Sequence, residues 1–147
     1  MKCVVALFLS LGLSSCALAA GNAVSYEVDG SAFEGHYISP APDVPLVLLV
    51  HDWDGLTEYE LKRSEMLSGL GYAVFVVDLF GAGVRPETLE ERRRLTGELY
   101  ADRELMRARL YGALEAARSQ GGNTASVVAM GYCFGGTAVL ELARSGA

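Results

Sequence analysis

The stretch SVVAMGYCFGGT at residues 126–137 decides the fold of this 147-residue chain. It begins with an uncharged, mostly apolar segment, which is typical of a strand buried on both faces of a parallel sheet. Glycines and a single cysteine follow, and residues 137–143 then have the composition of a helix. The stretch therefore predicts a sharp turn from a strand into a helix, with Cys133 at its centre.

In such a turn the central residue has a strained backbone, and the positions two residues before and after it are crowded. Gly131 and Gly135 occupy those positions. The turn exposes the central side chain at the C-terminal edge of the sheet, where open α/β folds bind ligands. It also places Cys133 at a helix N-terminus, whose partial positive charge favours the reactive thiolate. We predict that Cys133 is a nucleophile; the alternative is a small buried hydrophobic residue.

Acyl transfer to Cys133 also needs hydrogen-bond donors for the oxyanion. One is expected to be the backbone N–H of Phe134, directly after the nucleophile, and the second comes from the loop after an earlier strand. That loop is HDWDGL at residues 51–56, so the backbone N–H of Trp53 is the second candidate.

The rest of the chain predicts an α/β fold. Asp29-Gly30 separates two short strands and indicates a β-hairpin. Further apolar runs lie at residues 46–50 and 73–79, and helical patterns at residues 57–70 and 87–119. Alternating strands and helices favour a mostly parallel sheet with helices on both faces. We expect one domain, of the α/β-hydrolase type, over residues 20–147.

The N-terminus resembles an export signal. Lys2 precedes an uncharged apolar run at residues 4–13, and Ala17-Leu18-Ala19 supplies a cleavage pattern, so residues 1–19 are predicted to be a signal peptide. Cys16 lies in a lipobox-like LSSC segment and is an alternative site for a lipid anchor. Both routes predict an exported protein, periplasmic or secreted in bacteria, in which Cys133 is the only cysteine of the folded domain.

Composition excludes several function classes. The chain has 12 Lys and Arg against 18 Asp and Glu, a net charge of −6, and no basic stripe that would bind nucleic acid. Two His and three Cys without a CxxC or HxxxH pair predict no metal site. No second apolar segment predicts a transmembrane helix, and no organic cofactor is implied.

Together the segments HDWDGL, VVDLFGAGVRP and MGYCFGGTA resemble the dienelactone hydrolase family of α/β-hydrolases. The resemblance begins near Tyr26, with a Tyr-x-Val-Asp-Gly hairpin found in exported members, and runs to the last residue. It implies a carboxymethylenebutenolidase-like hydrolase of small esters or lactones, acting through a thioester on Cys133.

The resemblance also implies roles for three further residues. Asp52 stands where the family usually has a glutamate that helps to deprotonate the thiol; the alternative is a carboxylate at a helix start. Arg85 lies near the family's arginine for a substrate carboxylate, or is an ordinary surface residue. His51 matches a histidine that shapes the oxyanion loop, and we interpret it as structural rather than as the general base.

In this fold the triad runs along the chain as nucleophile, acid and histidine. Residues 134–147 contain neither Asp nor His, so we expect that the C-terminal part of the fold is missing, with an unpaired sheet edge and little or no turnover by this chain alone. Two alternatives remain at this point. One is a non-catalytic exported protein that binds a ligand at the strand-to-helix turn around Cys133, residues 131–135, here called the elbow. The other is a thiol redox sensor.

Overall fold

A computed structural model describes residues 21–146 of the protein. The predicted signal peptide, with its alternative lipid-anchor site Cys16, lies outside the described residues. The elements in chain order are β1 Asn22–Val28, β2 Ser31–Ile38, β3 Pro45–Val50, α1 Glu58–Gly69, β4 Ala73–Val77, α2 Leu89–Ala101, α3 Arg103–Ser119, β5 Asn123–Gly131 and α4 Phe134–Arg144. No helix in this part of the chain is long and apolar enough to cross a bilayer.

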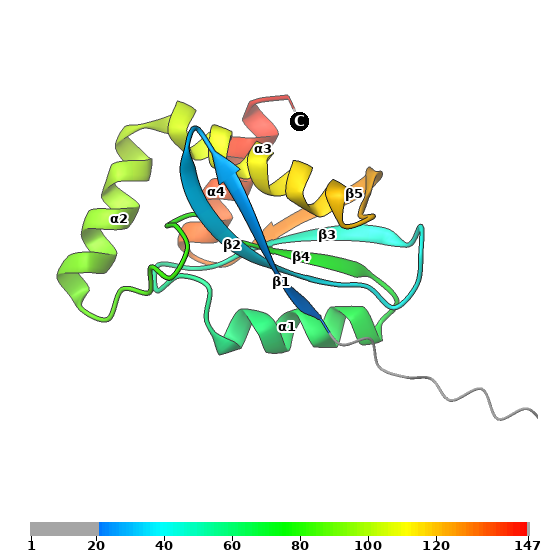
Figure 1. Cartoon of the computed structure of the whole chain (residues 1–147). Helices are drawn as coiled ribbons and strands as arrows, with labels where there is room; N and C mark the ends of the chain where they lie inside the picture. The colour runs from blue at the N-terminus through cyan, green and yellow to red at the C-terminus, as the bar shows by residue number, and fades with distance from the viewer. Residues whose placement is uncertain (1–20, 147) are drawn as a thin grey trace, which may run out of the picture.

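The strands form one five-stranded sheet in the order β1-β2-β4-β3-β5 (Figure 1). β4, β3 and β5 run parallel, whereas β1 and β2 are antiparallel to each other and β2 is antiparallel to β4. Asp29 and Gly30 connect the hairpin with positive φ angles of 49° and 74°, the conformation that short hairpin turns require. The predicted α/β fold with an N-terminal hairpin is confirmed.

Helices cover both faces of the sheet (Figure 1). Along β3, Leu46 and Leu48 join the core beneath α3 and α4, while Val47 and Leu49 join a smaller core beneath α1. This alternation explains the uninterrupted apolar run, because a strand covered on both faces needs apolar residues at every position. The prediction of helices on both faces is therefore confirmed.

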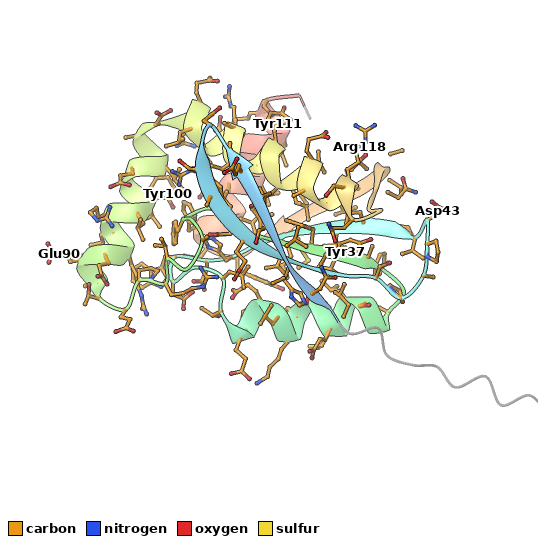
Figure 2. All side chains as sticks on the ribbon, in the orientation of Figure 1. Tyr37, Asp43, Glu90, Tyr100, Tyr111 and Arg118 are labelled. Atoms are coloured by element: carbon orange, nitrogen blue, oxygen red, sulfur yellow. The ribbon has the colours of Figure 1, made fainter. Side chains whose placement is uncertain are left out.

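The helical stretch predicted at residues 87–119 is two helices. Asp102 has an extended backbone between α2 and α3, and its Oδ1 accepts a hydrogen bond from the N–H of Leu105 at 2.9 Å. An aspartate that caps a new helix in this way ends the preceding one. On α2 the charged residues 90–94 are exposed or half-buried, and Glu90 projects away from the sheet (Figure 2).

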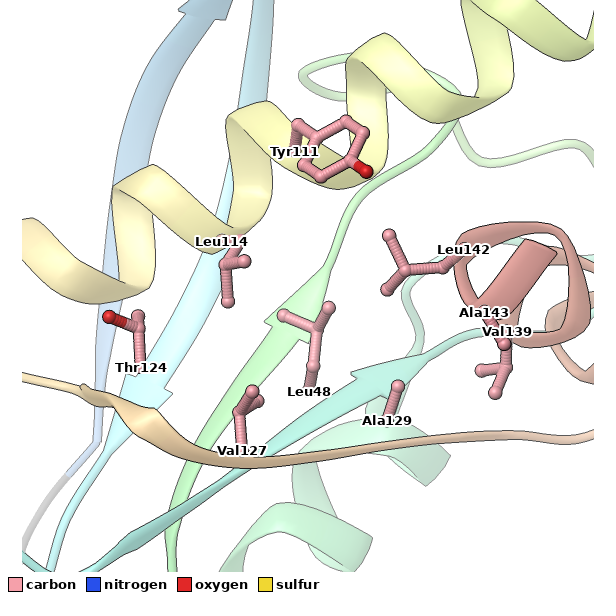
Figure 3. A pocket seen from close by; sticks show the side chains of 9 residues that line it. All are labelled: Leu48, Tyr111, Leu114, Thr124, Val127, Ala129, Val139, Leu142 and Ala143. Atoms are coloured by element: carbon pink, nitrogen blue, oxygen red, sulfur yellow. The ribbon is translucent and has the colours of Figure 1, made fainter. Parts of the chain in front are cut away.

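Strand β5 is longer than predicted and is not buried on both faces in the described part of the chain. It is the last strand in the sheet, and Val128 is 65% exposed. An apolar groove of about 380 Å³ lies between β5, α3 and α4, lined by side chains that include Leu114, Val127 and Val139 (Figure 3). The expected unpaired sheet edge is thus present along residues 21–146.

Candidate active site

The site is built where two neighbouring parallel strands end. Val50, the last residue of β3, is paired with Gly131, the last residue of β5. Because the register brings both carboxyl ends to the same level, the segments that follow leave the sheet side by side. These are the loop at residues 51–56 and the turn at residues 132–134.

Cys133 occupies a strained backbone conformation in that turn. Its φ and ψ are 51° and −115°, a region that costs a residue other than glycine about 1–3 kcal/mol. The residue is exposed and stands at the N-cap position of α4, where its side chain makes no capping hydrogen bond. The thiol is therefore free to meet a ligand at the positive end of the helix.

Gly131 and Gly135 make this conformation sterically feasible. A Cβ on Gly131 would lie 2.4 Å from the carbonyl carbon of Gly135. A Cβ on Gly135 would lie 2.5 Å from the carbonyl oxygens of both Val50 and His51. The first turn of α4 thus packs directly on the ends of β5 and β3, and only glycine fits at either position.

Two backbone N–H groups in the segments that follow β3 and β5 are unpaired within the described residues. Within residues 21–146, neither the N–H of Trp53 nor that of Phe134 donates to a protein acceptor. Phe134 is the first residue of α4, where a helix leaves its N–H without a partner. The Trp53 ring lies under the guanidinium of Arg92, 5.6 Å from the ring centroid, which holds the loop against α2.

His51 is a buried link between the segments that follow β3 and β4, with 1% exposure. Its Nε2 accepts a hydrogen bond from the N–H of Leu79 at 3.0 Å, so its Nδ1 carries the proton and donates to the carbonyl of Asp52 at 2.6 Å. The ring packs against Phe80 and Phe134. Burial lowers the pKa of His51, so the ring is neutral and both nitrogens are occupied.

Asp52 is turned toward its own loop. Its Oδ1 accepts the N–H of Asp54 at 3.1 Å. A hydrogen bond between the two carboxyl groups raises the pKa of Asp54 to about 6, and lowers the pKa of Asp52 despite its partial burial. Within the described residues no hydrogen bond joins Asp52 to Cys133, so the predicted role of Asp52 in activating the thiol stays a prediction. Asp54 was not predicted as part of the site. The Asp-x-Asp spacing could have indicated it, because it is typical of a turn in which the first side chain accepts the N–H of the third residue.

Arg85 is bound to its own loop. Its Nη1 donates to the carbonyl of Val84 at 2.8 Å. The side chain lines a cleft of about 270 Å³ with Glu34 and His36, and Cys133 is not among the residues that line this cleft. The contacts do bring together Gly131 at the end of β5, the start of α4 from Cys133 to Gly135, and His51.

The family model described as the dienelactone hydrolase family matches residues 33–147. The chain belongs to this family. No match is found among curated proteins.

Solved structures agree with this assignment. The structure of m3DLH shares 32% identity at a TM-score of 0.84, covering 89% of this chain and 56% of that one. A dienelactone hydrolase-like promiscuous phosphotriesterase from metagenomic libraries shares 27% at a TM-score of 0.83, covering 89% and 56%. Dienelactone hydrolase from Anabaena variabilis shares 25% at a TM-score of 0.64, covering 88% and 59%. The chain thus spans little more than half the length of these structures.

Replacement of Gly131 by alanine tests the close packing of the elbow. We expect Gly131→Ala to lower the free energy of unfolding by about 1–3 kcal/mol, because the new Cβ would push the end of β5 away from the backbone of Gly135 in α4. Gly136→Ala is the matched control: its Cβ would lie 3.4 Å from the nearest atom, and alanine is favoured in a helix by about 0.5–1 kcal/mol. Urea denaturation of both variants measures the difference, and equal losses would contradict the packing.

Acid destabilisation tests the neutral state of His51. Because its pKa is lowered from 6.5 on folding, the unfolded chain binds a proton that the folded protein does not. The contribution of His51 to stability is complete above about pH 6.5 and declines as the pH falls below that value, by up to about 1.4 kcal/mol per pH unit. Urea titrations over this range should show a shallower decline for His51→Gln. His36→Gln, at a half-buried histidine, is the control and should flatten the decline less.

Proposed function

We propose that this chain supplies the nucleophile and the oxyanion hole of a hydrolase for small carboxylic esters or lactones. The observation that carries the proposal is the exposed Cys133 in a strained turn at a helix N-terminus, followed directly by Phe134, whose N–H is unpaired within residues 21–146. The N–H of Trp53, also unpaired there and in the loop after the neighbouring strand β3, supports it. Membership of the dienelactone hydrolase family supports it. A redox sensor would need a reactive thiol, but it would not need two backbone N–H groups that can bind an oxyanion.

In the first step the Cys133 thiolate attacks the carbonyl carbon of the ester. The new S–C bond pushes the π electrons onto the carbonyl oxygen, and this oxyanion accepts hydrogen bonds from Trp53 and Phe134. Collapse of the intermediate re-forms the carbonyl and breaks the C–O bond, which leaves a thioester. The departing alkoxide takes from solvent the proton that the thiol released when it ionised, and leaves as the alcohol. Attack by water on the thioester then releases the acid and restores the thiol.

Neither histidine of the chain is placed to activate that water. His51 is buried with both ring nitrogens occupied. His36 lies on β2, separated from β5 by β4 and β3 in the sheet, or about 14 Å at the usual strand spacing. We therefore propose that this chain is acylated readily and deacylated slowly, and that the complete activity needs a base not found among residues 21–146.

The proposed location is outside the cytoplasm, in the periplasm or secreted. It rests on residues 1–19, with their short charged start, apolar run and Ala-x-Ala pattern. The N-terminal residue of the processed protein tests it: Ala20 is expected, and a lipid-modified Cys16 would indicate the alternative anchor. An unprocessed Met1 would contradict export.

Single-turnover acylation tests the proposed function. On mixing with a p-nitrophenyl ester, the chain should release p-nitrophenolate in a burst equal to its own concentration, and peptide mass spectrometry should find the acyl group on Cys133. Cys133→Ala should abolish the burst. Because Cys3 and Cys16 are the other cysteines, a Cys3→Ser, Cys16→Ser variant is the control and should keep it. An acyl group elsewhere, or no burst, would overturn the proposal.

A further inference from the structure

The strained turn at Cys133 needs support from its surroundings, since such a conformation persists only where neighbouring contacts hold it. On the α4 side, the N–H of Gly135 donates to the carbonyl of Tyr132 at 2.8 Å. The Tyr132 side chain, directly before Cys133, is bound by a different element. Its hydroxyl accepts a hydrogen bond from Nη2 of Arg63 on α1 at 2.6 Å.

Arg63 makes more than this one contact. Its guanidinium lies 5.6 Å from the ring centroid of Tyr132 and 5.9 Å from that of Tyr59. The two tyrosine rings also meet edge to face, with centroids 6.2 Å apart. Tyr59 and Arg63 are one helical turn apart on α1, so both reach Tyr132 from the same side of the helix.

Tyr59, Arg63 and Tyr132 form a three-residue cluster, here called the clamp, that holds the elbow from the second face of the sheet. α1 and α4 cover opposite faces (Figure 1), and the turn between β5 and α4 is held by both: its backbone by the start of α4, its Tyr132 side chain by α1. An exposed surface arginine usually contributes little. Here the guanidinium combines a short hydrogen bond with contacts to two rings, at the residue adjacent to the thiol.

We propose that Arg63 is a positioning residue for Cys133, acting through Tyr132 to keep the thiol at the N-terminus of α4. The positive end of the helix favours the thiolate. Without the contacts of Arg63 the turn relaxes and the sulfur moves away from that end, so the thiol becomes less reactive. The chemical use of that thiol rests on the proposed function. Its reactivity does not, and can be measured separately.

To test the positioning role of Arg63, the rate at which iodoacetamide alkylates Cys133 is measured in a Cys3→Ser, Cys16→Ser background. Arg63→Gln should slow the reaction by about threefold, the effect expected for losing one exposed cation–π contact with its hydrogen bond. Arg63→Lys, which keeps a cation and a donor, should recover part of the rate. Lys62→Gln is the matched control: it removes the same charge from the next residue of α1, where the ammonium pairs with Glu58 instead.

A double-mutant cycle with Tyr132→Phe separates positioning from a general effect on stability. Tyr132→Phe removes the acceptor hydroxyl and keeps the ring, so Arg63→Gln should slow alkylation less in that background. The proposal is overturned if Arg63→Gln reacts as fast as its parent, if Lys62→Gln slows it equally, or if the two effects are independent. Circular dichroism of each variant confirms that the folded protein is measured. A slowed alkylation without an acylation burst would retain the clamp and reject the hydrolase.

Discussion

The rest of the site depends on one steric constraint, the backbone contact between the start of α4 and the ends of β3 and β5. Gly135 lies so close to the carbonyl oxygens of Val50 and His51 that no Cβ fits, and Gly131 lies equally close to Gly135. This contact sets where α4 begins, forces Cys133 to a positive φ, and exposes its side chain. The thiol, the helix N-terminus and the N–H of Phe134 are therefore placed by the same few atoms.

The loop after β3 is fixed to this elbow by His51. The ring bonds to the end of β4 through Leu79, to its own loop through the carbonyl of Asp52, and packs against Phe134. A charged imidazolium could not accept the Leu79 N–H, so burial and neutrality of His51 go together. The loop that carries Trp53 is thus fixed to the start of α4 through His51, although it follows a different strand.

Features with local causes could be predicted from the sequence. The Asp29-Gly30 hairpin, the capping box from Thr57 to Glu60 and the glycines around Cys133 each follow from rules that act within a few residues. The break at Asp102 also had a local signal, since aspartate is a strong helix cap, but the continuous helical composition on both sides concealed it.

Features set by distant contacts could not be predicted. The exposure of Val128 depends on which strand is last in the sheet. The contact of Arg63 with Tyr132 joins residues 69 positions apart, and the turning of Asp52 toward Asp54 is a choice between partners that spacing alone does not decide. The family motifs located the elbow and its loop, while the residues that hold them emerge only from the fold.

We propose that Cys133 and the N–H groups of Trp53 and Phe134 form one reacting centre. A crystal structure of the protein treated with a small trifluoromethyl ketone tests it most directly, because the adduct mimics the tetrahedral intermediate. We expect a bond from Sγ of Cys133 to the former carbonyl carbon, with the oxyanion about 2.7–3.1 Å from both backbone nitrogens. An adduct whose oxygen points to solvent, or a Cys133 with negative φ, would contradict it.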